Sequence, residues 1–116
     1  MNKNYSDELP ASFVQDAATP SRTINFCVEE QDGREEGRYS YYSVSVPMTH
    51  WNYDQIVSAI ITAEYSSDRM QAIQNNFLRA MRGDAGAKSD DYLTEFNDMQ
   101  NWRDMAKATA HEVLGQ

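Results

Sequence analysis

The sequence predicts an α+β protein in which an antiparallel β-hairpin precedes three helices. Between residues 23 and 47, apolar and polar residues alternate with a period of two, which is typical of half-buried strands. From residue 53 onward, apolar residues recur every three or four positions, as on one face of an amphipathic helix. Strands and helices are segregated along the chain, which distinguishes this class from an alternating α/β fold.

Two strands are expected, over residues 23–30 and 38–47. The segment between them contains Asp32-Gly33 and a second glycine, which supply turn chemistry for a hairpin. A lone hairpin is marginal in water, so one of its faces must pack on the helices. The first strand has Ile24, Phe26 and Val28 on one face, and Cys27 is expected to be a small buried residue on the other.

Three helices are expected, over residues 53–64, about 68–82 and 90 to about 114. Each follows residues of the kind that cap helix N-termini. The candidate caps are Thr49 or Asn52, Ser66 or Ser67, and Ser89 or Asp90. The polar and aromatic cluster His50, Trp51, Tyr53 and Asp54 is therefore interpreted as the start of a helix and not as an active site.

The length of 116 residues suits one domain. Residues 1–21 contain two prolines and no periodicity, so they are expected to form a flexible tail, with one helical turn conceivable at 11–18. Residues 22–116 are expected to form the single α+β domain. The tail could also extend the hairpin into a larger sheet.

Composition excludes several classes of function. The formal net charge of −8 opposes nucleic-acid binding, which neutralises phosphates with Lys and Arg. A single cysteine excludes an intramolecular disulfide and a thiolate metal site. No apolar run approaches the roughly 20 residues of a membrane span, and the polar start is unlike a secretory signal. We therefore expect no membrane partner and a cytoplasmic location.

Catalytic and metal-binding patterns are absent from the sequence. His50 and His111 are the only histidines and lack HExxH spacing, and there is no GxSxG. The turn over 29–37 has five carboxylates, but aligning Gly33 with the glycine of an EF-hand loop leaves non-ligating residues at both ends. No catalytic residue, metal or cofactor is therefore expected, although folding could still assemble a pocket around either histidine.

Four residues are candidates for an interaction surface: Tyr39, Tyr41, Trp102 and Met105. The tyrosines lie on a strand with aromatic residues on both faces, and exposed Tyr is typical of interfaces. Trp102 and Met105 flank the apolar stripe of the last helix. The alternative is ordinary packing within the chain.

The sequence resembles a group of uncharacterised small bacterial proteins associated with prophages and other mobile elements. The similarity covers 51–78 and 99–114, with Trp51, the "IVSAII" and "AIQNNFL" segments, and the "WR..AK" spacing that starts at Trp102. The resemblance implies a small accessory protein that acts by contact, and it assigns no functional residue.

The leading hypothesis is a non-enzymatic module that binds a protein partner or self-associates. The alternative is an acidic nucleic-acid mimic that inhibits a DNA-binding protein, for which Asp91, Glu95 and Asp98 recur at helical spacing. A small enzyme with an unrecognised site is the third.

Overall fold

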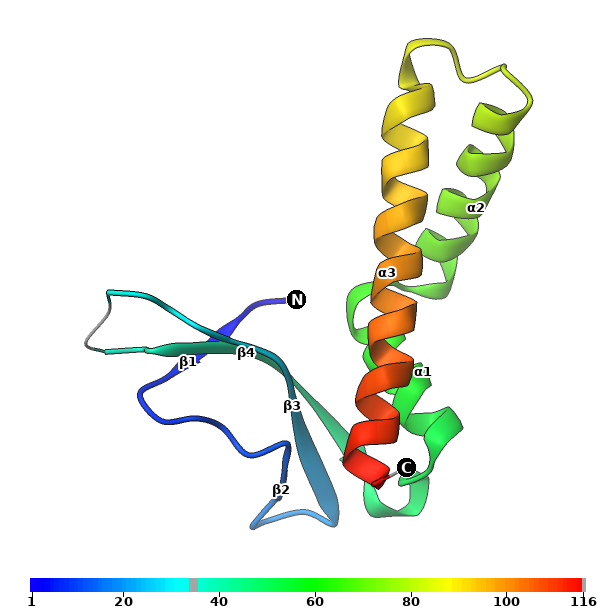
Figure 1. Cartoon of the computed structure of the whole chain (residues 1–116). Coiled ribbons are helices and arrows are strands. Elements are labelled where there is room, and N and C mark those ends of the chain that lie inside the picture. Colours follow the sequence, from blue (N-terminus) through cyan, green and yellow to red (C-terminus); the bar gives the residue numbers. More distant parts are fainter. Residues whose placement is uncertain (34–35, 116) are drawn as a thin grey trace.

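The computed structural model describes residues 1–33 and 36–115 and confirms the α+β class. A four-stranded antiparallel sheet precedes three α-helices (Figure 1). The long strands are β3 (Ser21–Glu30) and β4 (Tyr39–Pro47), the two strands of the predicted hairpin. A hairpin turn was predicted between them, and residues 34 and 35 of that segment lie outside the described residues.

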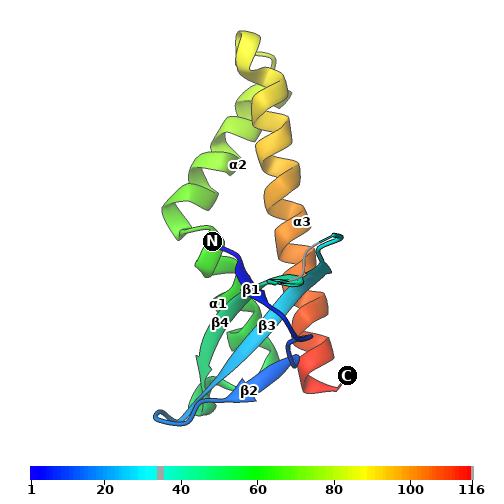
Figure 2. The ribbon, with the colours of Figure 1, turned by 90° about the vertical axis from the view of Figure 1, so that its left-hand side faces the viewer.

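Two further strands come from the N-terminal segment, where the sequence predicts a flexible tail. β1 (Asn4–Ser6) pairs with β4 and β2 (Phe13–Gln15) pairs with β3, giving the order β1-β4-β3-β2 (Figure 2). The expectation of a flexible tail is corrected at these residues, where the alternative that the tail extends the hairpin into a larger sheet is confirmed, and the conceivable helical turn at 11–18 is wrong. Both strands have only three residues, too few to show a periodicity, and the unpaired edges of the hairpin provide their partners.

A bulge in β3 changes which side chains are buried. Phe26 pairs with Tyr42, but Glu29 pairs with Ser40, so β3 has one extra residue between them. Cys27 occupies the left-handed region with φ 54°, as the first residue of one type of bulge does. Ile24 and Phe26 share the buried face of β3, which the sequence alone did not select, whereas Val28 and Cys27 are exposed, and the prediction of a buried Cys27 is wrong.

The helices lie close to their predicted positions. They are α1 (Tyr53–Glu64), α2 (Ser67–Met81) and α3 (Ser89–Leu114). Asn52 caps α1 by accepting from the backbone N–H of Gln55 at 3.0 Å, and Ser66 caps α2. The predicted cap of α3 is wrong, because a 3₁₀ turn (Gly86–Lys88) leads into this helix and no side chain caps it.

The core lies where α1, the C-terminal half of α3 and one face of the sheet meet. The β4 face that bears Tyr42, Val44 and Val46 packs toward the helices. The fully buried or nearly buried members of this core are Ile24, Phe26, Val46, Ile56, Ile60, Ile61, Ala106, Ala110 and Val113. A second cluster of Tyr65, Ile73 and Met99 joins α2 to α3.

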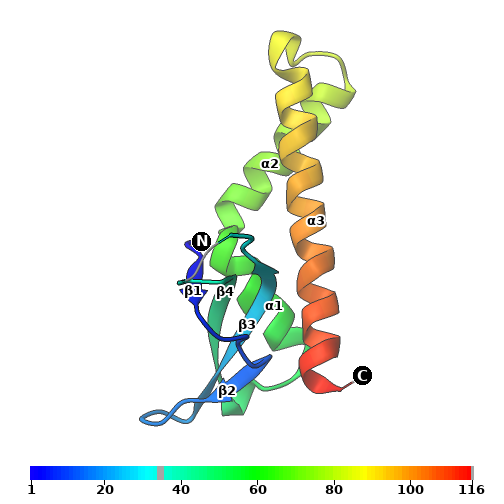
Figure 3. The same cartoon turned by 60° about the vertical axis from the view of Figure 1, so that its left-hand side comes forward.

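The molecule has two arms that project from this core. The end of β3 and the start of β4 extend to one side, and α2 with the N-terminal half of α3 extends beyond the sheet (Figures 1 and 3). The radius of gyration is 17.0 Å, against about 13 Å for a compact domain of this length. The two arms enclose a concave angle, which we call the corner. No helix in the described residues is long and apolar enough to cross a membrane.

Candidate functional site

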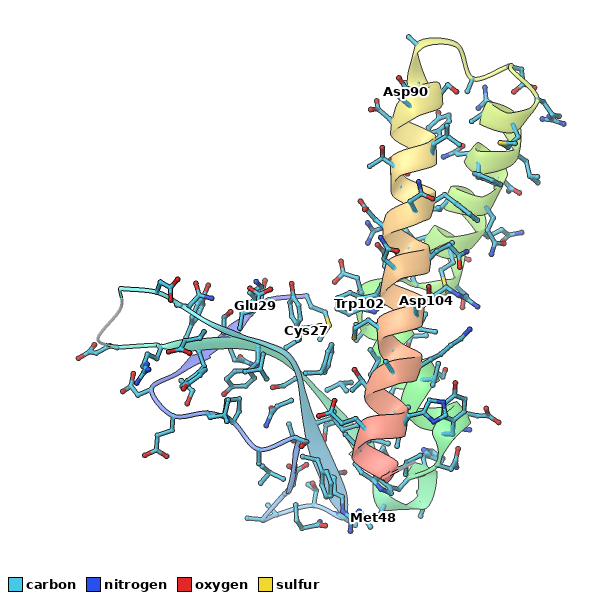
Figure 4. The ribbon with its side chains drawn as sticks, in the orientation of Figure 1. Cys27, Glu29, Met48, Asp90, Trp102 and Asp104 are labelled. Atoms are coloured by element: carbon cyan, nitrogen blue, oxygen red, sulfur yellow. The ribbon has the colours of Figure 1, made fainter. Side chains whose placement is uncertain are left out.

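A pocket of about 410 Å³ lies in the corner, between the bulge of β3, the end of α1 and the middle of α3. We call it the corner pocket. Three aromatic side chains line it, Tyr42 from β4, Tyr65 from the end of α1 and Trp102 from α3. Figure 4 shows Cys27 and Trp102 on facing sides of this corner.

Trp102 is fixed in place by its neighbours. Its indole N–H donates to the carbonyl of Ile60 on α1 at 2.9 Å. Its ring meets those of Phe26 and Tyr42 edge-on, with centroid distances of 5.9 and 5.5 Å. Because its only donor is used within the chain, Trp102 offers a partner its π surface and no hydrogen bond.

Two carboxylates line the same pocket and differ in their partners. Glu64 pairs with the N-terminal ammonium of Met1, and Arg69 lies 3.9 Å from its other oxygen. Asp98 makes no ion pair or side-chain hydrogen bond with any residue in the described part of the chain. One turn further along α3, Asn101 also lines the pocket with an exposed amide. The pocket therefore contains one carboxylate that is free to bind a cation.

Burial, with nearby carboxylates, raises the pKa of two titratable groups in the corner. Burial raises the pKa of the Tyr65 phenol, and the carboxylates of Glu64, Asp98 and Glu95 raise it further against the opposing effect of Arg69. Partial burial of the thiol raises the pKa of Cys27, and Glu29 adds to this shift. A raised pKa keeps the thiol protonated near neutral pH, which makes Cys27 a poor nucleophile.

A row of carboxylates continues from the pocket along α3. Asp91, Glu95 and Asp98 are spaced four and three residues apart, so they share one side of the helix. All three are exposed. We call this row the acidic ridge, and it runs from the pocket up the projecting half of α3.

The structure brings together two of the four predicted surface residues. Trp102 and Met105 line the corner pocket. Tyr39 and Tyr41 do not line it and are half-buried on β4, where the guanidinium of Arg38 lies 5.7 Å from the ring centroid of Tyr39. Two of the four candidates therefore lie at the pocket, and the interaction surface itself stays a prediction.

The prediction missed other residues that line the pocket. Glu64 and Tyr65 follow the periodic part of α1, and Cys27 was assigned to the buried interior. Asp98 was named from the sequence, but only as one of three carboxylates at helical spacing. In the structure it lines the pocket with Trp102.

The two histidines do not form a site together. His50 is exposed in the short 3₁₀ turn Met48–His50, and His111 packs on Tyr53 with a ring centroid distance of 4.7 Å. Neither lines the corner pocket. Among residues 1–33 and 36–115, no group of three or more His, Cys, Asp or Glu side chains is arranged to hold a metal ion.

Comparisons of the chain with protein-family models, with curated proteins and with solved structures gave no match.

Proposed function

We propose that the protein is a non-enzymatic interaction module that binds a basic segment of a partner protein in the corner. The observation that carries the proposal is the amount of surface that the two arms expose. The accessible surface is 7426 Å², whereas a compact monomer of this mass exposes about 6,500 Å². The excess of about 900 Å² is close to the roughly 800 Å² that each protein buries in a standard interface.

Charge supports a basic partner. The chain carries a formal net charge of −8, and the acidic ridge borders the open side of the corner. Complementary charge speeds the encounter of two proteins and fixes the orientation in which they dock. Aromatic residues in a corner of this kind supply the apolar contact that a docking surface needs. The same features suit a small accessory protein that acts by contact.

The proposal is tested by affinity capture from the native host's lysate with three baits. The first bait is the unchanged protein. The ridge variant carries Asp91→Asn, Glu95→Gln and Asp98→Asn, and the control variant neutralises three exposed carboxylates elsewhere, Glu8→Gln, Asp104→Asn and Glu112→Gln. We expect one stoichiometric basic protein on the unchanged and control baits and little of it on the ridge variant. Equal capture by all three baits would contradict the proposal.

A nucleic-acid mimic is the second candidate, and the exposed acidic ridge is the observation that favours it. A mimic would place these carboxylates in the groove of a DNA-binding protein. It predicts that the captured partner binds DNA, that added duplex DNA displaces it, and that moderate salt releases it. A partner that stays bound in the presence of DNA removes this candidate.

A further inference from the structure

We infer that the corner pocket binds the primary ammonium group of a lysine side chain on the partner. The inference rests on the proposed function and names the group that would anchor the partner. Carboxylates alone do not carry it. The pocket combines a free carboxylate, an amide and three aromatic rings, which is the set of groups that recognises an organic cation.

Two of the chain's own cations show that the aromatic rings of the pocket accept positive charge. The Lys3 ammonium lies 5.8 Å from the centroid of the Tyr42 ring, and the Arg69 guanidinium lies 4.6 Å from that of Tyr65. Two aromatic rings that line the pocket therefore already contact a cation, an ammonium at Tyr42 and a guanidinium at Tyr65.

Asp98 is the carboxylate that these cations leave unpaired. It lies one turn from Trp102 and Asn101 on α3 and lines the pocket with them. An incoming ammonium could donate to the Asp98 carboxylate and the Asn101 carbonyl oxygen while it contacts the Trp102 ring. Met105 completes the pocket with an apolar surface that suits the methylene stem of a lysine.

The size of the pocket fits this ligand. Its volume of about 410 Å³ lies within the range of about 300–1,000 Å³ that is typical of small-ligand sites. The pocket is open to the corner, so the backbone of a partner could lie along the acidic ridge while one side chain enters.

The test uses the full chain and three small probes, with no need for the partner. They are the N-acetyl methylamides of lysine, norleucine and arginine, where norleucine has the same stem without the charge. Binding is followed by NMR from the Asn101 amide and the Trp102 indole N–H, and by the rate at which a neutral reagent labels Cys27, the only cysteine. Asp98→Asn is the test variant. Asp104→Asn is the matched control, since Asp104 is exposed on the same helix and does not line the pocket.

We expect saturable shifts of the Asn101 and Trp102 signals with the lysine probe, together with slower labelling of Cys27. Asp98→Asn should weaken the binding about threefold or more, which is the size of an exposed charge pair, and Asp104→Asn should not change it. The inference is overturned by equal binding of norleucine, by tighter binding of arginine, or by equal effects of the two substitutions. If the lysine probe binds but no partner is captured from the lysate, only the proposed function is contradicted. If the partner is captured equally well by the Asp98→Asn variant, only the inference is contradicted.

Discussion

Met99 is fully buried between α2 and α3, in the cluster with Tyr65 and Ile73. Met99→Ala should lower the free energy of unfolding by about 2–5 kcal/mol, because the substitution removes apolar contacts and leaves a cavity. Leu78→Ala is the matched control, since Leu78 is 56% exposed on α2 and its truncation should change stability by less than about 0.5 kcal/mol. Chemical denaturation of both variants checks this prediction. Equal losses would contradict the packing of the two helices.

Tyr65 should make the free energy of unfolding depend on pH in the alkaline range. Its pKa is raised in the folded protein, so above about pH 10 the unfolded chain loses the phenolic proton first. The unfolded state is thereby favoured, and the stability present at lower pH is lost as the pH rises toward the folded pKa. Between about pH 9 and pH 11, the free energy of unfolding should fall by more in the unchanged protein than in the Tyr65→Phe variant. Parallel pH profiles of the two proteins would contradict this.

Single residues also mark the limit of what the sequence could predict. Alternation predicted that Ile24, Phe26 and Val28 share one face, and it failed at Val28 because of the bulge at Cys27. A bulge with a positive φ usually contains glycine, and cysteine gives no such indication. The pocket was missed for the same reason, since the bulge places Cys27 at the wall of the pocket.

Among the elements, the helices were the easiest to predict. α1 has its predicted bounds because five apolar residues recur at helical spacing and Asn52 precedes them. The bounds of β1 and β2 were not predicted, although pairing of the tail with the hairpin was an alternative, since strands of three residues depend on the edges of the hairpin for their formation. α3 starts at Ser89, one residue before its predicted start. Its predicted cap was wrong, because a 3₁₀ turn leads into this helix and no side chain caps it.

The cap of α1 provides a direct test at this scale. Asn52→Ala should lower the free energy of unfolding by about 1 kcal/mol, because it leaves the N–H of Gln55 without its acceptor. Asn75→Ala is the matched control, as Asn75 is exposed within α2 and alanine is the better helix former. Thermal or chemical denaturation measures both. An Asn52→Ala variant as stable as the unchanged protein would contradict the interpretation of the polar residues around position 52 as a helix start.

At the scale of the whole molecule, the angle between the two arms determines the candidate function. The sequence predicted the hairpin and the helices but not the direction in which each projects. That direction follows from contacts between distant residues, such as Trp102 with Ile60 and Phe26, which no local pattern shows. Nor could the sequence predict that Glu64, at the end of α1, lies beside Asp98 in one pocket.

The extended shape can be measured in solution. Small-angle X-ray scattering at several concentrations should give a radius of gyration near 17.0 Å or slightly above it, since bound water adds to the Cα value. A value near the 13 Å or so of a compact domain would mean that the arms fold together and close the corner.

The central claim is that a basic partner occupies the corner, and site-specific photocrosslinking tests it most directly. A photoreactive residue replaces Thr94, which is exposed on α3 between Asp91 and Asp98. In a control it replaces Lys107, which is exposed on the opposite side of this helix by its spacing. In the native host, we predict a crosslink to one basic protein from position 94 and none to that protein from position 107. No crosslink from position 94, or the same crosslink from both positions, would contradict the account.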